Sequence, residues 1–173
     1  MAKKGHNPLL GLVCGLAAGA GASALMDQYW AIVEKRPGDR PEQKKTKSGE
    51  EEKPSTQRIA DALSDAVTGH EVSKKDKAAA GVAVHYATGV ACGGLFGLLA
   101  VPQKGTGLLA GLAYGAAIWL FLDEIGLRVV HIAPDPREVP SKMHMEALGA
   151  HLVYGSATAL LTRLLLGVFG RSK

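Results

Sequence analysis

The chain has 173 residues, of which 47% are hydrophobic and 21% are charged. The 20 basic residues only slightly outnumber the 16 acidic ones and form no basic patch interleaved with aromatic side chains, so nucleic-acid binding is not predicted. The two cysteines lie in apolar runs, which excludes a disulfide-stapled secreted domain and a four-cysteine zinc site. More than half of the charged residues lie between Glu34 and Lys77. The remaining charge-poor stretches are typical of a small multi-pass membrane protein.

Four segments have the length and composition of transmembrane helices, because about 30 Å of hydrocarbon is crossed at about 1.5 Å per residue. We predict spanning helices at 8–33, 78–101, 105–124 and 146–169. They should be helices because the backbone groups of a segment in lipid must be satisfied within that segment. The short turn after Pro102 predicts that the second and third spans are antiparallel neighbours.

The connectors between the spans differ in character. Within the charged connector 34–77, segment 37–54 has no apolar period and is expected to be disordered. Apolar residues then recur at helical spacing, which predicts a short amphipathic helix at 55–68. This helix is expected at the membrane interface or against the bundle, and a solvated helix without a role is the alternative. Segment 125–145 contains three prolines and is predicted to be a rigid loop.

The first and third spans share a pattern of residues. Gly11, Gly15, Gly19 and Asp27 recur 96 positions later as Gly107, Gly111, Gly115 and Asp123. The second and fourth spans repeat in turn, since His85 and Gly89 match His151 and Gly155. We therefore predict two repeated hairpins that enter the membrane from the same side. A cleavable signal peptide is the alternative interpretation of the first span, but a leader has no reason to copy an internal helix.

Glycines recur at every fourth position in three of the spans. This spacing lets two backbones approach closely, and such packing drives helix association in lipid because the hydrophobic effect does not. We expect these glycines to pack the spans into a tight bundle, with a homo-oligomeric face as the alternative. The glycines with this predicted role are Gly11, Gly15, Gly19, Gly89, Gly93, Gly97, Gly107, Gly111 and Gly115.

Ionisable and polar side chains gather toward the connector ends of the spans. Asp27 and Asp123 stand at these ends, and His85 and His151 lie about 8–10 Å into the second and fourth spans at about 1.5 Å per residue. Ionisable residues within a membrane are costly and point to a function. The predicted polar cluster is Asp27, His85, Tyr86, Asp123, Glu124, His151 and Tyr154.

Three interpretations of this cluster are open. In the first, each histidine is structural and donates to a carboxylate or carbonyl of a neighbouring helix. In the second, the cluster senses or relays protons, because the unperturbed pKa of histidine is about 6.5. In the third, His144 and His151 join Met143 or Met145 and the carboxylates around a metal or small ligand, although the spacing matches no specific ligand motif. We predict no cofactor and no metal.

The remaining signals give little biochemical detail. The sequence has no nucleophile elbow, phosphate-binding loop or zincin helix, so an enzyme is not predicted. Cys14 and Cys92 are interpreted as small packing residues. The excess of Lys and Arg on the connectors favours a cytoplasmic location for them, whereas Lys3 and Lys4 argue for the opposite orientation.

Four motifs carry a family resemblance. They are Ala24-Leu25-Met26-Asp27, Val84-His85-Tyr86 followed by Gly89, Gly93 and Gly97, Trp119 with Asp123-Glu124, and His151-Leu152-Val153-Tyr154-Gly155. Together they resemble the YagU-like family of bacterial inner-membrane proteins, a domain of unknown function of about this length, with 37–54 as a variable insertion. The resemblance implies a multi-pass protein of the bacterial plasma membrane and no reaction type.

These observations predict an all-α integral membrane four-helix bundle built from two repeated transmembrane hairpins, with the lipid bilayer as its main partner. The leading function is a structural or stress-linked membrane component whose polar cluster stabilises the packing of the helices and tunes it with pH. One alternative is a small oligomeric transporter or channel subunit. Another is an assembly partner of a larger membrane complex that docks through 55–68.

Overall fold

The computed structural model describes residues 7–35, 54–100, 107–130, 132 and 139–170. Regular structure in these residues is helical throughout: α1 (Pro8–Val33), α2 (Ser55–Thr68), α3 (Lys77–Ala100), α4 (Leu108–Ile118), η1 (Trp119–Gly126), α5 (Leu127–Val129) and α6 (Ser141–Phe169). The helices α4, η1 and α5 follow without a break and form one rod with a π-helical middle. This rod, α1, α3 and α6 are each long and apolar enough to cross a membrane. Within the described ranges, the prediction of an all-helical chain with four such helices is confirmed, and it indicates a membrane protein.

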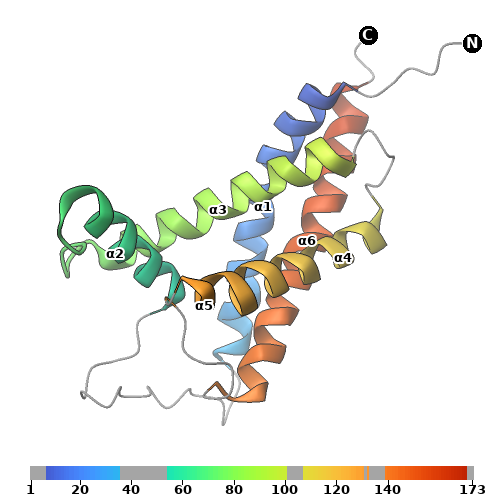
Figure 1. Cartoon of the computed structure of the whole chain (residues 1–173). Coiled ribbons are helices and arrows are strands. Elements are labelled where there is room, and N and C mark those ends of the chain that lie inside the picture. The colour runs from blue at the N-terminus through green and yellow to red at the C-terminus, as the bar shows by residue number, and fades with distance from the viewer. Residues whose placement is uncertain (1–6, 36–53, 101–106, 131, 133–138, 171–173) are drawn as a thin grey trace, which may run out of the picture.

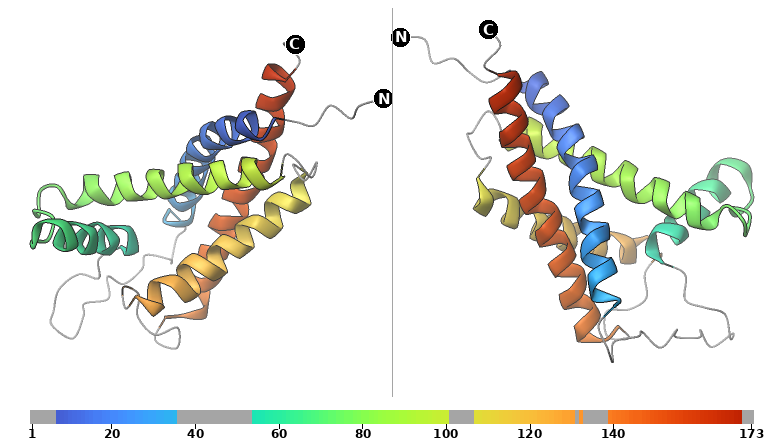
Figure 2. Two further views of the ribbon diagram at one scale, coloured as in Figure 1. Left: turned by 45° about the horizontal axis from the view of Figure 1, so that its top comes forward. Right: turned by 180° about the vertical axis from the view of Figure 1, so that it is seen from behind.

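The long helices form two crossed layers. In Figure 1, α1 and α6 run side by side in opposite directions, and α3 and the α4–η1–α5 rod lie across them. The view from behind in Figure 2 brings α1 and α6 to the front and leaves the other two helices behind them. The N-terminal half of α3 extends past the α1/α6 pair, and α2 packs against it there.

The prediction that the second and third spans are antiparallel neighbours holds only in part. Among the described residues, the α3 and α4 backbones do not pack along their length, and Tyr114 carries their contact. Its ring lies 5.1 Å from that of Phe96, measured between centroids. A short connection requires only that two helix ends be close, and both helices find better partners in the other layer. The connection itself, 101–106, is outside the described residues.

Glycine brings α1 and α3 into direct backbone contact. A methyl group on Gly15 or Gly19 would overlap a carbonyl oxygen of α3, and one on Gly93 would overlap the α1 backbone. The contacting pairs on successive turns are Gly11 with Gly97, Gly15 with Gly93, and Gly19 with Gly89. A larger residue in place of Gly15, Gly19, Gly93 or Gly97 would meet the backbone of the other helix and would separate the two helices, whereas one in place of Gly89 would meet the side chain of Ser23.

The same kind of contact joins α4 to α6. A methyl group on Gly111 would overlap the carbonyl oxygen of Gly155, and one on Gly115 would overlap that of His151. Gly107 differs from the prediction, because no atom lies within 4 Å of a side chain built there. It occupies the N-cap of α4, where the helix has not yet reached its partner.

The apolar core lies where α1 meets α6. Ala22 and Met26 of α1 pack there with Ala150, Tyr154 and Ala157 of α6. Alanines predominate because the two helices approach too closely for larger side chains on the facing surfaces. Cys14 is buried and Cys92 is half-buried, and both are free thiols.

Two helix ends differ from their predicted positions. The third span was expected to end at residue 124, but the rod continues to Val129, because Arg128 pairs with Glu124 one turn earlier. The fourth span was expected to begin at residue 146, but α6 begins at Ser141 directly after Pro140, whose φ of −57° suits a helix start. The loop predicted for 125–145 is therefore much shorter. Residues 133–138, and all of the predicted disordered segment 37–54 except Pro54, are outside the described residues.

The glycine contacts predict a sharp contrast between two alanine substitutions. Gly93→Ala should destabilise the protein by about 1–3 kcal/mol, because its methyl group would meet the backbone of Gly15 and Gly19. Gly167→Ala is the matched control, since it lies in α6 with nothing within 4 Å, and helix propensity favours alanine there. Reversible unfolding in mixed micelles measures both. Equal effects of the two substitutions would show that the close contact contributes nothing.

Candidate functional site

One Asp–His pair joins α1 to α3. His85 Nε2 lies 3.2 Å from Asp27 Oδ1 and 3.5 Å from the carbonyl oxygen of Ser23. Tyr86 donates a hydrogen bond of 2.9 Å to the other oxygen of Asp27. A neutral histidine with its proton on Nε2 can donate to both acceptors, so these contacts do not require a charged ring.

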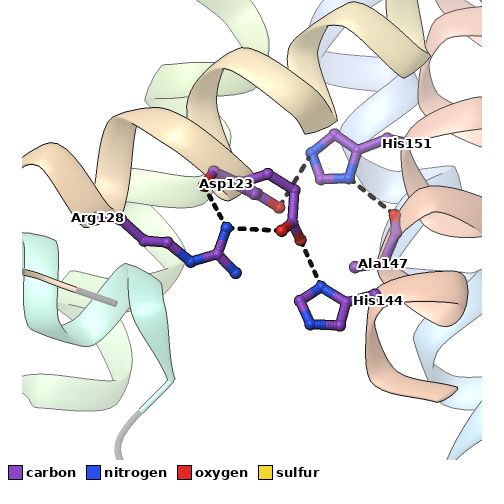
Figure 3. A network of polar contacts seen from close by, with 6 residues as sticks. Asp123, Arg128, His144, Ala147 and His151 are labelled. Carbon is purple, nitrogen blue, oxygen red and sulfur yellow. Dashed lines mark hydrogen bonds and ion pairs between the residues drawn. The ribbon is translucent and has the colours of Figure 1, made fainter. Parts of the chain in front are cut away.

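A second Asp–His pair joins η1 to α6. His151 Nε2 lies 3.6 Å from Asp123 Oδ2, while its Nδ1 lies 2.9 Å from the carbonyl oxygen of Ala147. Figure 3 shows the ring held between these two oxygen groups. Because a carbonyl oxygen only accepts, Nδ1 must carry a proton. The contact of Nε2 with Asp123 then depends on whether a second proton is present.

Glu124 lies beside the second pair, with both carboxylate oxygens engaged. Arg128 Nη1 is 2.6 Å from Oε2, and His144 Nδ1 is 2.6 Å from Oε1. Arg128 also donates to the backbone carbonyl of Glu124. Figure 3 shows Arg128 approaching from η1's C-terminal side and His144 from α6. The guanidinium and imidazole groups offset the cost of an acidic side chain that is largely shielded from water.

Two tyrosines bind carbonyl oxygens of α3. Tyr154 of α6 donates a buried hydrogen bond of 2.6 Å to the carbonyl of Gly89, and Tyr114 of α4 donates one of 2.6 Å to that of Cys92. These carbonyls lie one turn apart. The glycine-rich surface of α3 leaves them accessible, so the tyrosines tie α3 to both α4 and α6.

The predicted polar cluster is thus divided into two sets of contacts and a separate tyrosine. Asp27, His85 and Tyr86 form one, and Asp123 with His151 forms the second, beside Glu124. Tyr154 lies apart from the carboxylates, in the core. Sequence reasoning missed Arg128 as the partner of Glu124, although its spacing of four residues on a helix was a usable signal. It also missed Tyr114, which no spacing rule singles out.

The predicted residues do not assemble into a metal centre within the part of the chain that the structure describes. No group of three or more His, Cys, Asp or Glu side chains there is arranged to hold a metal ion. His144, one of the two histidines of the metal interpretation, contacts Glu124 directly. The thioethers of Met143 and Met145 belong to exposed side chains.

Comparison of the chain with protein-family models, curated proteins and solved structures finds no match. The coarse class, a helical membrane protein, therefore rests on its four long apolar helices.

The tyrosine contacts predict an ordering of two Tyr→Phe substitutions. Tyr154→Phe should lower the free energy of unfolding by about 1 kcal/mol, because it removes a donor to the buried carbonyl of Gly89. Tyr86→Phe is the matched control and should cost less, since its hydroxyl serves the exposed side chain of Asp27. Unfolding of the two variants in the same micelles gives the comparison. A larger loss for Tyr86→Phe would contradict the assignment of Tyr154 as the inter-helix tie.

Proposed function

We propose that this protein is a non-enzymatic structural component of a membrane, whose helix packing responds to protonation through two interhelical Asp–His pairs. The observation that carries the proposal is the commitment of His151 Nδ1 to the carbonyl of Ala147. A neutral His151 then turns the lone pair of Nε2 toward Asp123, which is repulsive if the carboxylate is ionised. A proton added to either partner makes the contact attractive.

We further propose that the chain consists of two duplicated hairpins, α1 with α3 and the α4–η1 helix with α6. The Asp–His pairs support this, because Asp27 and Asp123 correspond at an offset of 96 and His85 and His151 correspond at an offset of 66. Each hairpin also has glycine backbone contacts between its two helices.

The π-helical segment has a role in this duplication. Gly19 lies against Gly89, but its counterpart Gly115 lies against His151, so the second hairpin is shifted by one helical turn. Asp123 nevertheless contacts His151, and it lies in η1, where a π-helix has more residues per turn and a smaller rise per residue than an α-helix; the altered direction of its side chain supports the idea that η1 accommodates the shift.

The cellular setting is proposed from the same residues. The motifs that resemble the YagU-like family, including the Asp123-Glu124 pair and the His151-Tyr154-Gly155 run, favour a bacterial inner-membrane protein. Two of these motif residues, Asp123 and His151, are the ones whose contact depends on a proton. A structural component that adjusts its packing to pH is consistent with a stress-linked role.

The two pairs should respond differently to pH in double-mutant cycles made with Asp→Asn and His→Gln. For Asp123 and His151 we expect a favourable coupling energy of about 0.5–1.5 kcal/mol at about pH 5.5, which is lost or becomes unfavourable at about pH 8, because a neutral ring turns the lone pair of Nε2 toward the carboxylate. For Asp27 and His85 the coupling should persist at both pH values, because a neutral ring still donates through Nε2. Unfolding in micelles measures both cycles.

The contrast between the two cycles makes the experiment decisive. Equal coupling of Asp123 and His151 at both pH values would overturn the proton-dependent role while leaving a structural role intact. Loss of coupling in both cycles at both pH values would remove the Asp–His pairs from the function altogether.

A small oligomeric transporter or channel subunit is the second candidate, and the π-helical segment favours it. Such segments often occur at functional sites, and this one carries both Asp123 and Glu124. In vesicles with an internal pH dye, this candidate predicts proton flux that Asp123→Asn abolishes and Asp65→Asn, on the exposed surface of α2, leaves unchanged. A proton leak no faster than that of protein-free vesicles would eliminate this candidate.

A further inference from the structure

Helix α2 is attached to the ends of two spanning helices. Lys77, at the start of α3, contacts Asp61 of α2 and Glu71 beyond it, each at 2.7 Å. At the other end of α2, Arg58 donates a hydrogen bond of 2.9 Å to the carbonyl of Ile132, which follows α5. Both attachments therefore lie at the ends of helices that are long and apolar enough to span a membrane.

The side of α2 that packs on α3 is small and polar. Ala60 and Asp61 are buried, and a methyl group on Gly81 of α3 would collide with Gln57. Gly81 therefore permits α2 to lie close to the first turns of α3.

The apolar stripe of α2 is left exposed by this packing. The Leu63 side chain is 59% exposed and that of Val67 is 84% exposed. Ala62 and Ala66 are exposed as well, and Ile59 is half-buried. A helix of a water-soluble protein would normally bury such a stripe, so we expect another apolar surface to cover it.

We infer that the occupant is the bilayer, with α2 lying in the membrane interface and its Leu63–Val67 stripe inserted among the lipids. The helix is strongly amphipathic and has low overall hydrophobicity, which is typical of interfacial helices and unlike the four spans. Helix α2 also packs against a helix long and apolar enough to span a membrane, α3, whose own Val82 is exposed.

A second copy of the chain is a poorer occupant. The stripe has five aliphatic side chains, two of which are alanines, and these would bury on the order of 300 Å² of apolar surface. A stable protein–protein interface buries about 800 Å² on each partner. Insertion into lipid requires no minimum contact area, because the bilayer already surrounds α3, on which α2 packs.

Site-directed spin labelling of the full chain in phospholipid vesicles tests this inference. A nitroxide is attached at Val67→Cys, in a background of Cys14→Ala and Cys92→Ala. Collision with oxygen, which partitions into lipid, is compared with collision with a water-soluble nickel chelate. Asp65→Cys, on the opposite side of α2, is the aqueous control, and Leu109→Cys, an 81% exposed position on α4, is the lipid reference.

We expect the oxygen-to-nickel collision ratio at position 67 to be several-fold above that at position 65, and below that at position 109. Equal ratios at 65 and 67 would place the stripe in water and overturn the inference. Spin–spin broadening at 67 that disappears on dilution with unlabelled protein would assign the stripe to a second copy and would also overturn it. An aqueous ratio at 109 as well would defeat the membrane placement of the whole chain.

Discussion

Contact between glycine backbones is the constraint on which the rest of this structure depends. Lipid offers no hydrophobic force between helices, so their association needs close packing over many atoms. Gly15 and Gly19 of α1 meet Gly93 and Gly89 of α3 without an intervening side chain, and Gly111 and Gly155 do the same between α4 and α6. These contacts set the crossing of the two layers, and with it the position of every polar group on their surfaces.

The polar contacts follow from this close approach. Once α1 and α3 touch through glycine, Asp27 and His85 are within ion-pair distance a short way along the same interface. The carbonyl of Gly89 has no side chain beside it, which leaves room for the hydroxyl group of Tyr154. Small residues thus have two effects here: they bring backbones together, and they leave backbone acceptors open to side chains from other helices.

The glycine and polar patterns could be read from the sequence because they repeat. Spacing by four residues singles out glycines such as Gly15, Gly93 and Gly111 that lie in backbone contacts, whereas Gly107 has no neighbour within 4 Å because it precedes the first turn of its helix. Depth along each helix placed Asp27 near His85 and Asp123 near His151. The hydroxyl group of Tyr154 donates to the carbonyl of Gly89, a contact that depth alone does not predict, because depth says nothing about the direction in which a long side chain points.

The identity of the four long apolar helices was determined by the sequence alone, because length and hydropathy are local properties that lipid imposes on each segment separately. Three features required the tertiary structure. The π-helical form of the segment that carries Asp123, and the contact of Asp123 with His151, depend on how η1 and α6 lie against each other. The pairing of His144 with Glu124 requires η1 and α6 to lie together. The outward direction of the apolar stripe of α2 follows from the close packing of another side of α2 on Gly81 of α3. In each case the local sequence is compatible with more than one geometry, and the packing between helices selects the one observed.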